Sequence, residues 1–184
     1  METDKIINLI KERFPTHPLP EKIGADGMDS IFTQQLFSGT AWTEVSASFL
    51  KSSKNACFNE HRDLMTDQAR SYYLPGYMTA CLRDDPESLD IVLDLLYMEL
   101  NKSQSGSNPA YHHQRFDGLT SFLSAPQKEA VAVFLQHQAT HVGKNELSAG
   151  MKNEMAKAAY DSYWFQFFRE EPCPATCSSS VPRM

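Results

Sequence analysis

Two histidines, His137 and His141, stand four residues apart in a stretch with helical periodicity. On a helix this spacing points two imidazoles at one metal ion. Zinc needs a third and a fourth ligand, and only distant residues such as His112 or His113 could supply them. The residue after His137 is not the glutamate of a metalloprotease signature. The pair shares a helical side with apolar residues, so the pattern favours histidines at the edge of the core over a metal site.

Cysteines are the next candidates for chemistry. Cys57 and His61 have i, i+4 spacing, which could place a thiol beside a base. Such dyads are usually assembled from separate parts of a fold, so a buried cysteine near a surface histidine is expected instead. Cys173 and Cys177 lie in a polar stretch whose context is too loose for a zinc knuckle or a redox pair. With no phosphate loop or nucleophile elbow either, the sequence predicts no catalytic residue and no cofactor.

Three tyrosines, Tyr72, Tyr73 and Tyr77, lie in the apolar stretch from residue 66 to residue 82. Their hydroxyl groups could line a pocket and hold a polar ligand. Aromatic residues in helices are more often part of the core, with one end in contact with water. Both interpretations stay open at this point.

Acidic residues are concentrated between residues 84 and 99, where the segment contains six acids and no lysine or arginine. The charge of this segment equals the formal net charge of the chain, which is −6. Helical spacing would align three of the acids in one stripe. A solvated surface is the ordinary meaning of such a run, and a docking face for a basic partner is the alternative. The candidates for partner binding are Asp84, Asp85, Glu87, Asp90 and Asp94.

Helices must position these residues, because the chain shows helical periodicity and no sustained strand alternation. Residues 101–113 have the composition of a flexible connection. We expect one or two helical turns near residues 45–50 and a weak helical segment at 57–64. Helices are expected at about residues 3–13, 28–37, 66–83, 86–100, 116–123, 124–143 and 146–169.

The helix at residues 66–83 is predicted to be central, because its apolar face is wide. Thr66 is a plausible N-cap. Pro75 lacks an amide hydrogen and its ring collides with a carbonyl of the preceding turn, which predicts a kink between Ser71 and Leu74. The last helix carries more aromatic residues than one stripe can hold, which indicates either burial on nearly all sides or contact with another chain.

Length and composition limit the fold and the partners. The chain of 184 residues fits one all-α, bundle-like domain of six to eight helices over residues 1–170, followed by a disordered tail at 171–184. The negative net charge argues against nucleic acid as a ligand. No apolar run is long enough to span a bilayer, and the N-terminus does not look like a signal peptide. A cytoplasmic protein is therefore expected.

Four short blocks resemble a bacterial domain family of unknown function. They are a glycine turn followed by tryptophan at 39–42, Tyr-Tyr-Leu-Pro at 72–75, Phe-x-x-Leu at 116–119, and Gln-x-x-Ala-Val-x-x-Phe-Leu at 127–135. The similarity covers about residues 37–138. The aromatic last helix and the cysteine-containing tail lie outside it. The resemblance implies a bacterial helical domain, and it supplies no activity.

The sequence therefore favours a protein–protein interaction module. Its most concrete form is a small acidic protein that neutralises a basic partner, as immunity proteins do for toxins. The alternative is an enzyme or a small-molecule-binding protein that uses the tyrosine-rich helix and the histidines as a pocket. Genomic position behind a toxin-like gene would favour the first reading.

Overall fold

The computed structural model describes residues 2–28, 30–51, 61–83, 90–103, 108–140 and 146–168. Within these residues the chain forms eight α-helices, which confirms the predicted all-α fold and helix count. An isolated antiparallel bridge joins Gly24 and Met65. The predicted tail at 171–184 lies outside the described residues. The elements are α1 (Thr3–Arg13), α2 (Ser30–Phe37), η1 (Trp42–Glu44), α3 (Ala47–Lys51), α4 (Asp67–Arg83), α5 (Asp90–Leu100), α6 (Pro109–Ser121), α7 (Ala125–Thr140), α8 (Glu146–Ser162) and η3 (Trp164–Phe167), where η marks a 3-10 helix.

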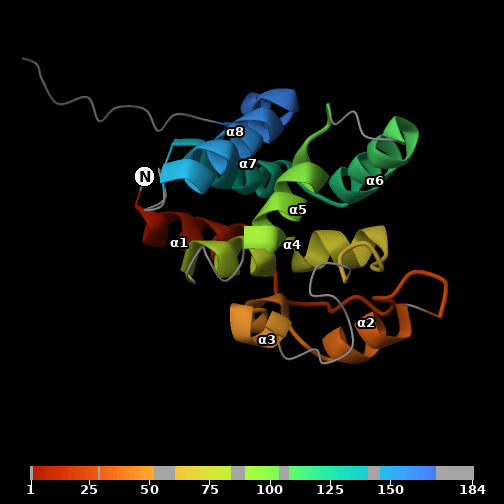
Figure 1. Ribbon diagram of the computed structural model, residues 1–184. Coiled ribbons are helices and arrows are strands. Elements are labelled where there is room, and N and C mark those ends of the chain that lie inside the picture. Colours follow the sequence, from red (N-terminus) through yellow and green to blue (C-terminus); the bar gives the residue numbers. More distant parts are fainter. Residues whose placement is uncertain are drawn as a thin grey trace, which may run out of the picture.

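Helix α4 lies at the centre of the fold, with α1, α6 and η1 packed against it. Helices α7 and α8 pack on each other on one side, while α2 and α3 lie at the opposite end of the molecule (Figure 1). Every residue of α4 from Tyr73 to Cys81 is buried, as the wide apolar face predicted. Among the described residues, no helix combines the length and the apolar character needed to cross a membrane.

Helix α4 passes through Pro75 with helical backbone on both sides, as expected. The backbone stays helical from Ser71 to Leu74, so Pro75 does not break the helix, and the size of any bend stays a prediction. The next residue, Gly76, has its own reason to be small. A Cβ atom there would lie 2.5 Å from the carbonyl oxygen of Trp42. The missing side chain at Gly76 thus lets η1 pack directly on the backbone of α4.

Residues 109–113 are helical, although their composition indicated a flexible connection. The predicted flexible connection at 101–113 is wrong in its last part, because α6 begins at Pro109. The side chain of Asn108 accepts a hydrogen bond of 3.2 Å from the amide of Tyr111, and Pro109 fits the first helical turn, where no amide hydrogen is needed. This start places Tyr111 and His112 on a helix rather than in a loop.

The aromatic C-terminal segment does not continue as one helix to residue 169, as predicted. Helix α8 ends at Ser162, and the chain turns at Tyr163 into the short helix η3. The change of direction sends aromatic residues to different sides. Trp164 is fully buried and its indole donates to the carbonyl of Leu100, whereas Phe165 is exposed. The turn explains how one short segment holds so many aromatic residues.

Candidate functional site

Six charged side chains meet where α4, α5, α6 and the turn at residues 61–64 come together. We call this set the charged cluster, and its centre is Glu99 on α5. Glu99 Oε2 accepts 2.6 Å from Arg62 Nε, and Oε1 accepts 2.7 Å from Arg70 Nη1. The side chain of Glu99 is only 12% exposed, so both ion pairs are largely shielded from water. The members are Arg62, Asp63, Asp67, Arg70, Glu99 and Arg115.

The arginines also bind backbone groups, which ties separate elements together. Arg70 is fully buried; its Nη2 donates to the Asp67 carboxylate and, at 3.0 Å, to the carbonyl of Arg115 on α6. Arg115 in turn donates to the carbonyls of Arg62 and Asp63, at 3.0 and 3.1 Å, and to the Asp63 carboxylate at 3.2 Å. The cluster therefore fastens α5 to α4 and the turn at 61–64 to α6.

Local sequence explains why these groups can approach. The hydroxyl of Thr66 accepts from the amide of Ala69 at 3.2 Å, which confirms Thr66 as the N-cap of α4. The cap places Asp67 in the first turn, one turn before Arg70. On the facing helix, Gly118 leaves the necessary space, because a Cβ atom there would overlap the Asp67 carboxylate. A larger residue at that position would push Asp67 away from Arg70.

Electrostatics hold the cluster in its charged form. Burial acts to raise the pKa of Glu99, but the charges of Arg62 and Arg70 outweigh this effect and the pKa is lowered. Burial likewise acts to lower the pKa of Arg70, and Glu99 and Asp67 outweigh it, so the pKa is raised. Each charge is therefore stabilised by its neighbours and destabilised by burial. Removing one partner would leave a buried charge without compensation.

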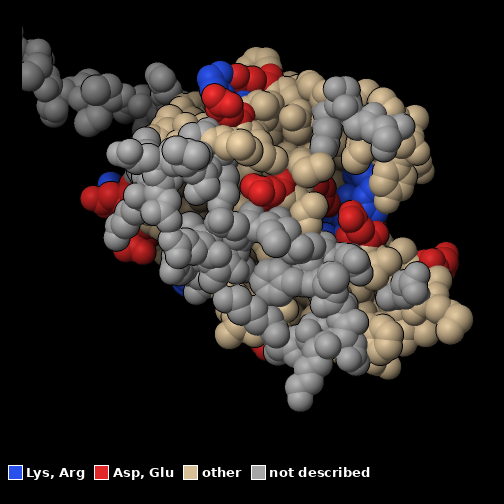
Figure 2. All heavy atoms as spheres, viewed as in Figure 1, with Lys and Arg blue, Asp and Glu red and all other residues tan. Residues whose placement is uncertain are grey.

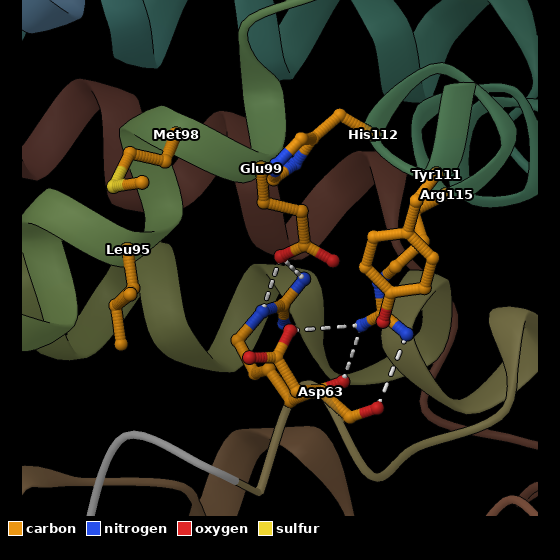
Figure 3. A pocket seen from close by; sticks show the side chains of 8 residues that line it. Asp63, Leu95, Met98, Glu99, Tyr111, His112 and Arg115 are labelled. Atoms are coloured by element: carbon orange, nitrogen blue, oxygen red, sulfur yellow. Dashed lines mark hydrogen bonds and ion pairs between the residues drawn. The ribbon is translucent and has the colours of Figure 1, made fainter. Parts of the chain in front are cut away.

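A small cavity of about 120 Å³ opens beside Glu99. Figure 2 shows basic and acidic side chains side by side in a hollow on this face, at the right of the view. In Figure 3, Leu95 and Met98 lie on one side of Glu99, Tyr111 and Arg115 lie on the other, and the ring of His112 points toward Glu99. The cavity is lined by Arg62, Asp63, Leu95, Met98, Glu99, Tyr111, His112 and Arg115.

The size of the cavity limits what it can hold. Sites for drug-sized ligands and cofactors usually measure roughly 300–1,000 Å³. A cavity of about 120 Å³ suits one amino-acid side chain, a small acid or a few water molecules. Two large side chains at its edge, Tyr111 and Met98, are 47% and 38% exposed. The floor of the cavity is thus formed by charged, hydrogen-bonded side chains, and its rim is partly apolar.

The three tyrosines proposed to form a pocket lie in or against the core. Tyr72 donates to the carbonyl of Thr16 at 2.6 Å, and Tyr73 donates to the carbonyls of Phe37 and Thr40, both at 3.0 Å. These bonds hold the N-terminal third of the chain to α4. The ring of Tyr77 lies under Arg62, with the guanidinium carbon 4.7 Å from the ring centroid. The cavity at Glu99 is lined by other residues, so a pocket made by the three tyrosines stays a prediction.

The histidine and cysteine candidates are only partly described. His137 is buried on α7, while His141 lies outside the described residues. His61 is buried rather than at the surface, and its Nδ1 lies 2.9 Å from the hydroxyl of Thr33. Cys57, Cys173 and Cys177 also lie outside the described residues. Over the described ranges, no group of three or more His, Cys, Asp or Glu residues could hold a metal ion.

Most of the acidic residues that were predicted to bind a partner lie outside the described residues. Asp84, Asp85 and Glu87 lie outside the described residues, and only the backbone of Asp90 is described, at the start of α5. Asp94 is half-buried. The acid that follows them on the same helix, at position 99, is the centre of the charged cluster and is neutralised there. The acidic run is therefore partly compensated by arginines from distant parts of the chain.

Sequence reasoning missed the charged cluster and its cavity. Arg62, Arg70 and Arg115 were not selected, because each lies in a different segment and none forms a motif with Glu99. One signal was present. Arg70 lies directly after Ala69 and one helical turn before Leu74, two apolar residues of the helix that is predicted to be central, so the sequence itself places a charged residue in that helix. A buried arginine requires an acidic partner, and that requirement could have prompted a search for one.

Comparisons with known proteins give a family and no function. Neither the curated proteins nor the solved structures contain a match. A family model described as "Family of unknown function (DUF6714)" matches residues 2–168. The match confirms the resemblance to an uncharacterised family and extends it, because it includes the aromatic C-terminal segment that the resemblance had left out. With nearly the whole described chain inside the match, the protein belongs to this family of unknown function.

Proposed function

We propose that this protein acts by protein–protein contact and that the cavity beside Glu99 receives one side chain of the partner. The observation that carries the proposal is the combination of exposed Tyr111 and Met98 with a small cavity between them. Tyrosine, methionine and arginine are enriched at the centres of protein interfaces. Binding energy in such interfaces concentrates where an anchor side chain fills a pocket.

The floor of the cavity supports this role because its side chains are held in place without a partner. Glu99, Arg62 and Arg115 are held by bonds to α4, to α6 and to the backbone of the turn at 61–64. A pocket that needs no ordering on binding avoids part of the entropy cost of association. The volume fits a single anchor and is small for a cofactor.

The charge of the chain supports a basic partner. A net charge of −6 would attract a cationic protein over several ångströms and speed its encounter. In its specific form, the proposal is that the chain is an immunity-type protein that neutralises a basic toxin. The acids Asp84, Asp85, Glu87, Asp90 and Asp94 would add to the attraction. Helix α5 carries Asp90 and Asp94 as well as Leu95 and Met98, so one helix would offer both charge and anchor pocket.

A second candidate function is the binding of a small polar molecule in the same cavity. The observation that favours it is the set of hydrogen-bonding groups along one side, His112, Tyr111 and Arg115 (Figure 3). The two candidates differ in whether the bound molecule contacts the rim of the cavity. A small molecule would leave the outer faces of Tyr111 and Met98 in water, whereas a protein would cover them.

The proposal is tested with a photo-crosslinking residue at Met98, in the full chain expressed in its native cell. A matched control carries the same residue at Met151, which is 68% exposed on α8 and does not line the cavity. We expect an adduct with one protein of basic isoelectric point at position 98 only. The adduct should weaken on Tyr111→Ala and with rising salt. Equal adducts at both positions, or no effect of Tyr111→Ala, would refute the proposal.

A further inference from the structure

We infer that the protein has a second binding site, a groove at the end of α8 that takes a small organic anion carrying an aromatic ring. The inference goes beyond the proposed function, because the groove shares no lining residue with the cavity beside Glu99. Its volume is about 660 Å³, within the range of roughly 300–1,000 Å³ that is usual for small-molecule sites. The groove is lined by Lys102, Ser103, His113, Ser162, Tyr163, Phe165 and Gln166.

The groove forms where the segment that leaves α5 is held against the end of α8. The amide of Lys102 donates to the hydroxyl of Ser162 at 3.0 Å, and the two segments lie side by side near the top of Figure 1. The chain then turns at Tyr163 into η3, where the side-chain amide of Gln166 donates to the Tyr163 carbonyl at 2.8 Å. These bonds hold the backbone on both sides of the groove in place without a ligand.

The ring of Tyr163 gives the groove a fixed aromatic surface. It meets the rings of Phe116 and Trp164 edge to face, with centroid distances of 5.0 and 5.1 Å. Phe165 also lines the groove, and it is 56% exposed because the turn at Tyr163 leaves it outside the core. Aromatic rings pack favourably on one another in stacked or edge-to-face arrangements. A ligand with an aromatic ring can therefore pack on these two side chains.

The charges at the groove favour an anion. The ammonium nitrogen of Lys102 lies 5.3 Å from the centroid of the Tyr163 ring, and that of Lys128 lies 5.9 Å from the same centroid. Within the described ranges, neither lysine forms an ion pair with an acid. His113 adds a ring nitrogen that can donate a hydrogen bond. In a chain of net charge −6, the groove thus has a basic lining.

The two features together define the class of ligand. A cationic ligand would meet Lys102 and no acid in the groove, since Asp161 lies outside the lining and pairs with Lys157. An anion without a ring would leave the aromatic surface in water. A ligand that has both groups can pair its charge with Lys102 while its ring packs on the aromatic surface.

The test measures the binding of naphthoate to the full-length protein by equilibrium dialysis. Naphthamide is the neutral control of nearly equal shape, and acetate is the anion without a ring. We expect one saturable site per chain for naphthoate, with an affinity at least about tenfold higher than that of either control. The affinity should fall as salt rises. Equal affinity for naphthamide, or the absence of a saturable site, would overturn the inference.

A pair of lysine variants tests the location of the site. Lys102→Gln removes the charge at the groove, whereas Lys5→Gln removes a charge on α1 from a side chain that is 70% exposed and lies outside the lining. The first change should weaken naphthoate binding about fivefold or more, and the second should leave it unchanged. Equal effects of the two changes would show that only the overall charge of the chain matters and would overturn the inference.

A pair of phenylalanine variants tests the aromatic surface and guards against an effect of Lys102→Gln on folding. Phe165→Ala removes an exposed ring from the groove, whereas Phe122→Ala removes a ring that is 53% exposed and lies outside the lining. Only Phe165→Ala should weaken naphthoate binding, and the far-UV circular dichroism of both variants should match that of wild type. Naphthoate binding that survives both Lys102→Gln and Phe165→Ala would place the anion elsewhere and reject the groove.

Discussion

Replacing Glu99 by glutamine should cost about 3 kcal/mol of unfolding free energy, the lower end of the range for breaking a buried ion pair. Glutamine keeps the shape of glutamate and loses only its charge, so the loss of stability does not come from altered packing. Arg70 retains the Asp67 carboxylate, whereas Arg62 loses its only acidic partner among the described residues. Because only one of the two arginines loses its acidic partner, we expect a cost at the low end of the range for breaking a buried ion pair. For a chain of this length the melting temperature should fall by roughly 6–12 °C.

The assay is urea denaturation followed by far-UV circular dichroism, with Asp63→Asn as the control. Asp63 pairs with Arg115 at 3.2 Å but its side chain is 68% exposed, so this change should cost about 0–1 kcal/mol. A loss below about 1 kcal/mol in Glu99→Gln, or equal losses in the two variants, would refute the view that the charged cluster holds α5 to α4.

The same variant gives a pH test with a definite sign. The pKa of Glu99 is lowered in the folded protein, so its contribution to stability is present above the unfolded value of about 4.3. The contribution is lost as the pH falls through the folded pKa, where wild type also becomes protonated. The difference between wild type and Glu99→Gln should therefore be full at neutral pH and shrink below about pH 4. A difference that grows on acidification would contradict the assignment.

Three further predictions concern single side chains. Tyr73→Phe removes a hydroxyl bonded to two carbonyls and should cost roughly 1–2 kcal/mol in urea denaturation, whereas Tyr77→Phe, whose hydroxyl has no partner among the described residues, should be nearly neutral. Gly76→Ala forces a Cβ toward the carbonyl of Trp42 and should cost about 1–3 kcal/mol in the same assay; wild-type stability would show that η1 can move away. Asn108→Ala removes the cap of α6 and should cost about 1 kcal/mol and speed amide exchange in its first turn; unchanged exchange would show that Pro109 alone sets the start.

Local signals in the sequence were sufficient for much of the fold. Thr66 was identified as a cap, and its hydroxyl does accept from the third residue that follows. Near the start of α7 the Ser124 amide donates to the side chain of Gln127 at 2.8 Å, which is one of the two hydrogen bonds of a capping box. Gly39 has a positive φ of 75° after α2, as expected of a residue that ends a helix. Each of these signals acts over three or four residues, the range that a single sequence displays.

The candidate site could not be predicted in the same way, because it depends on contacts between distant segments. Glu99 pairs with Arg62 and Arg70, which lie 37 and 29 residues earlier in the chain. In the sequence it was one more acid in an acidic run. The start of α6 was missed for a different reason: Asn108 and Pro109, which begin the helix, lie among polar residues typical of a loop. Tyr111, at the rim of the cavity, was missed for the same reason. The end of α8 was missed because helical periodicity continues past the turn at Tyr163.

The two tryptophans give the fold a pair of built-in optical reporters. Both are buried, and each indole donates to a backbone carbonyl: Trp42 to Pro15 at 3.0 Å and Trp164 to Leu100 at 2.8 Å. Trp42 therefore reports on the contact between η1 and the segment that follows α1, and Trp164 reports on the contact between α5 and η3. Their fluorescence should shift to longer wavelength when each contact opens to water. Variants that retain a single tryptophan would show whether the two ends of the molecule unfold in one cooperative step or in succession.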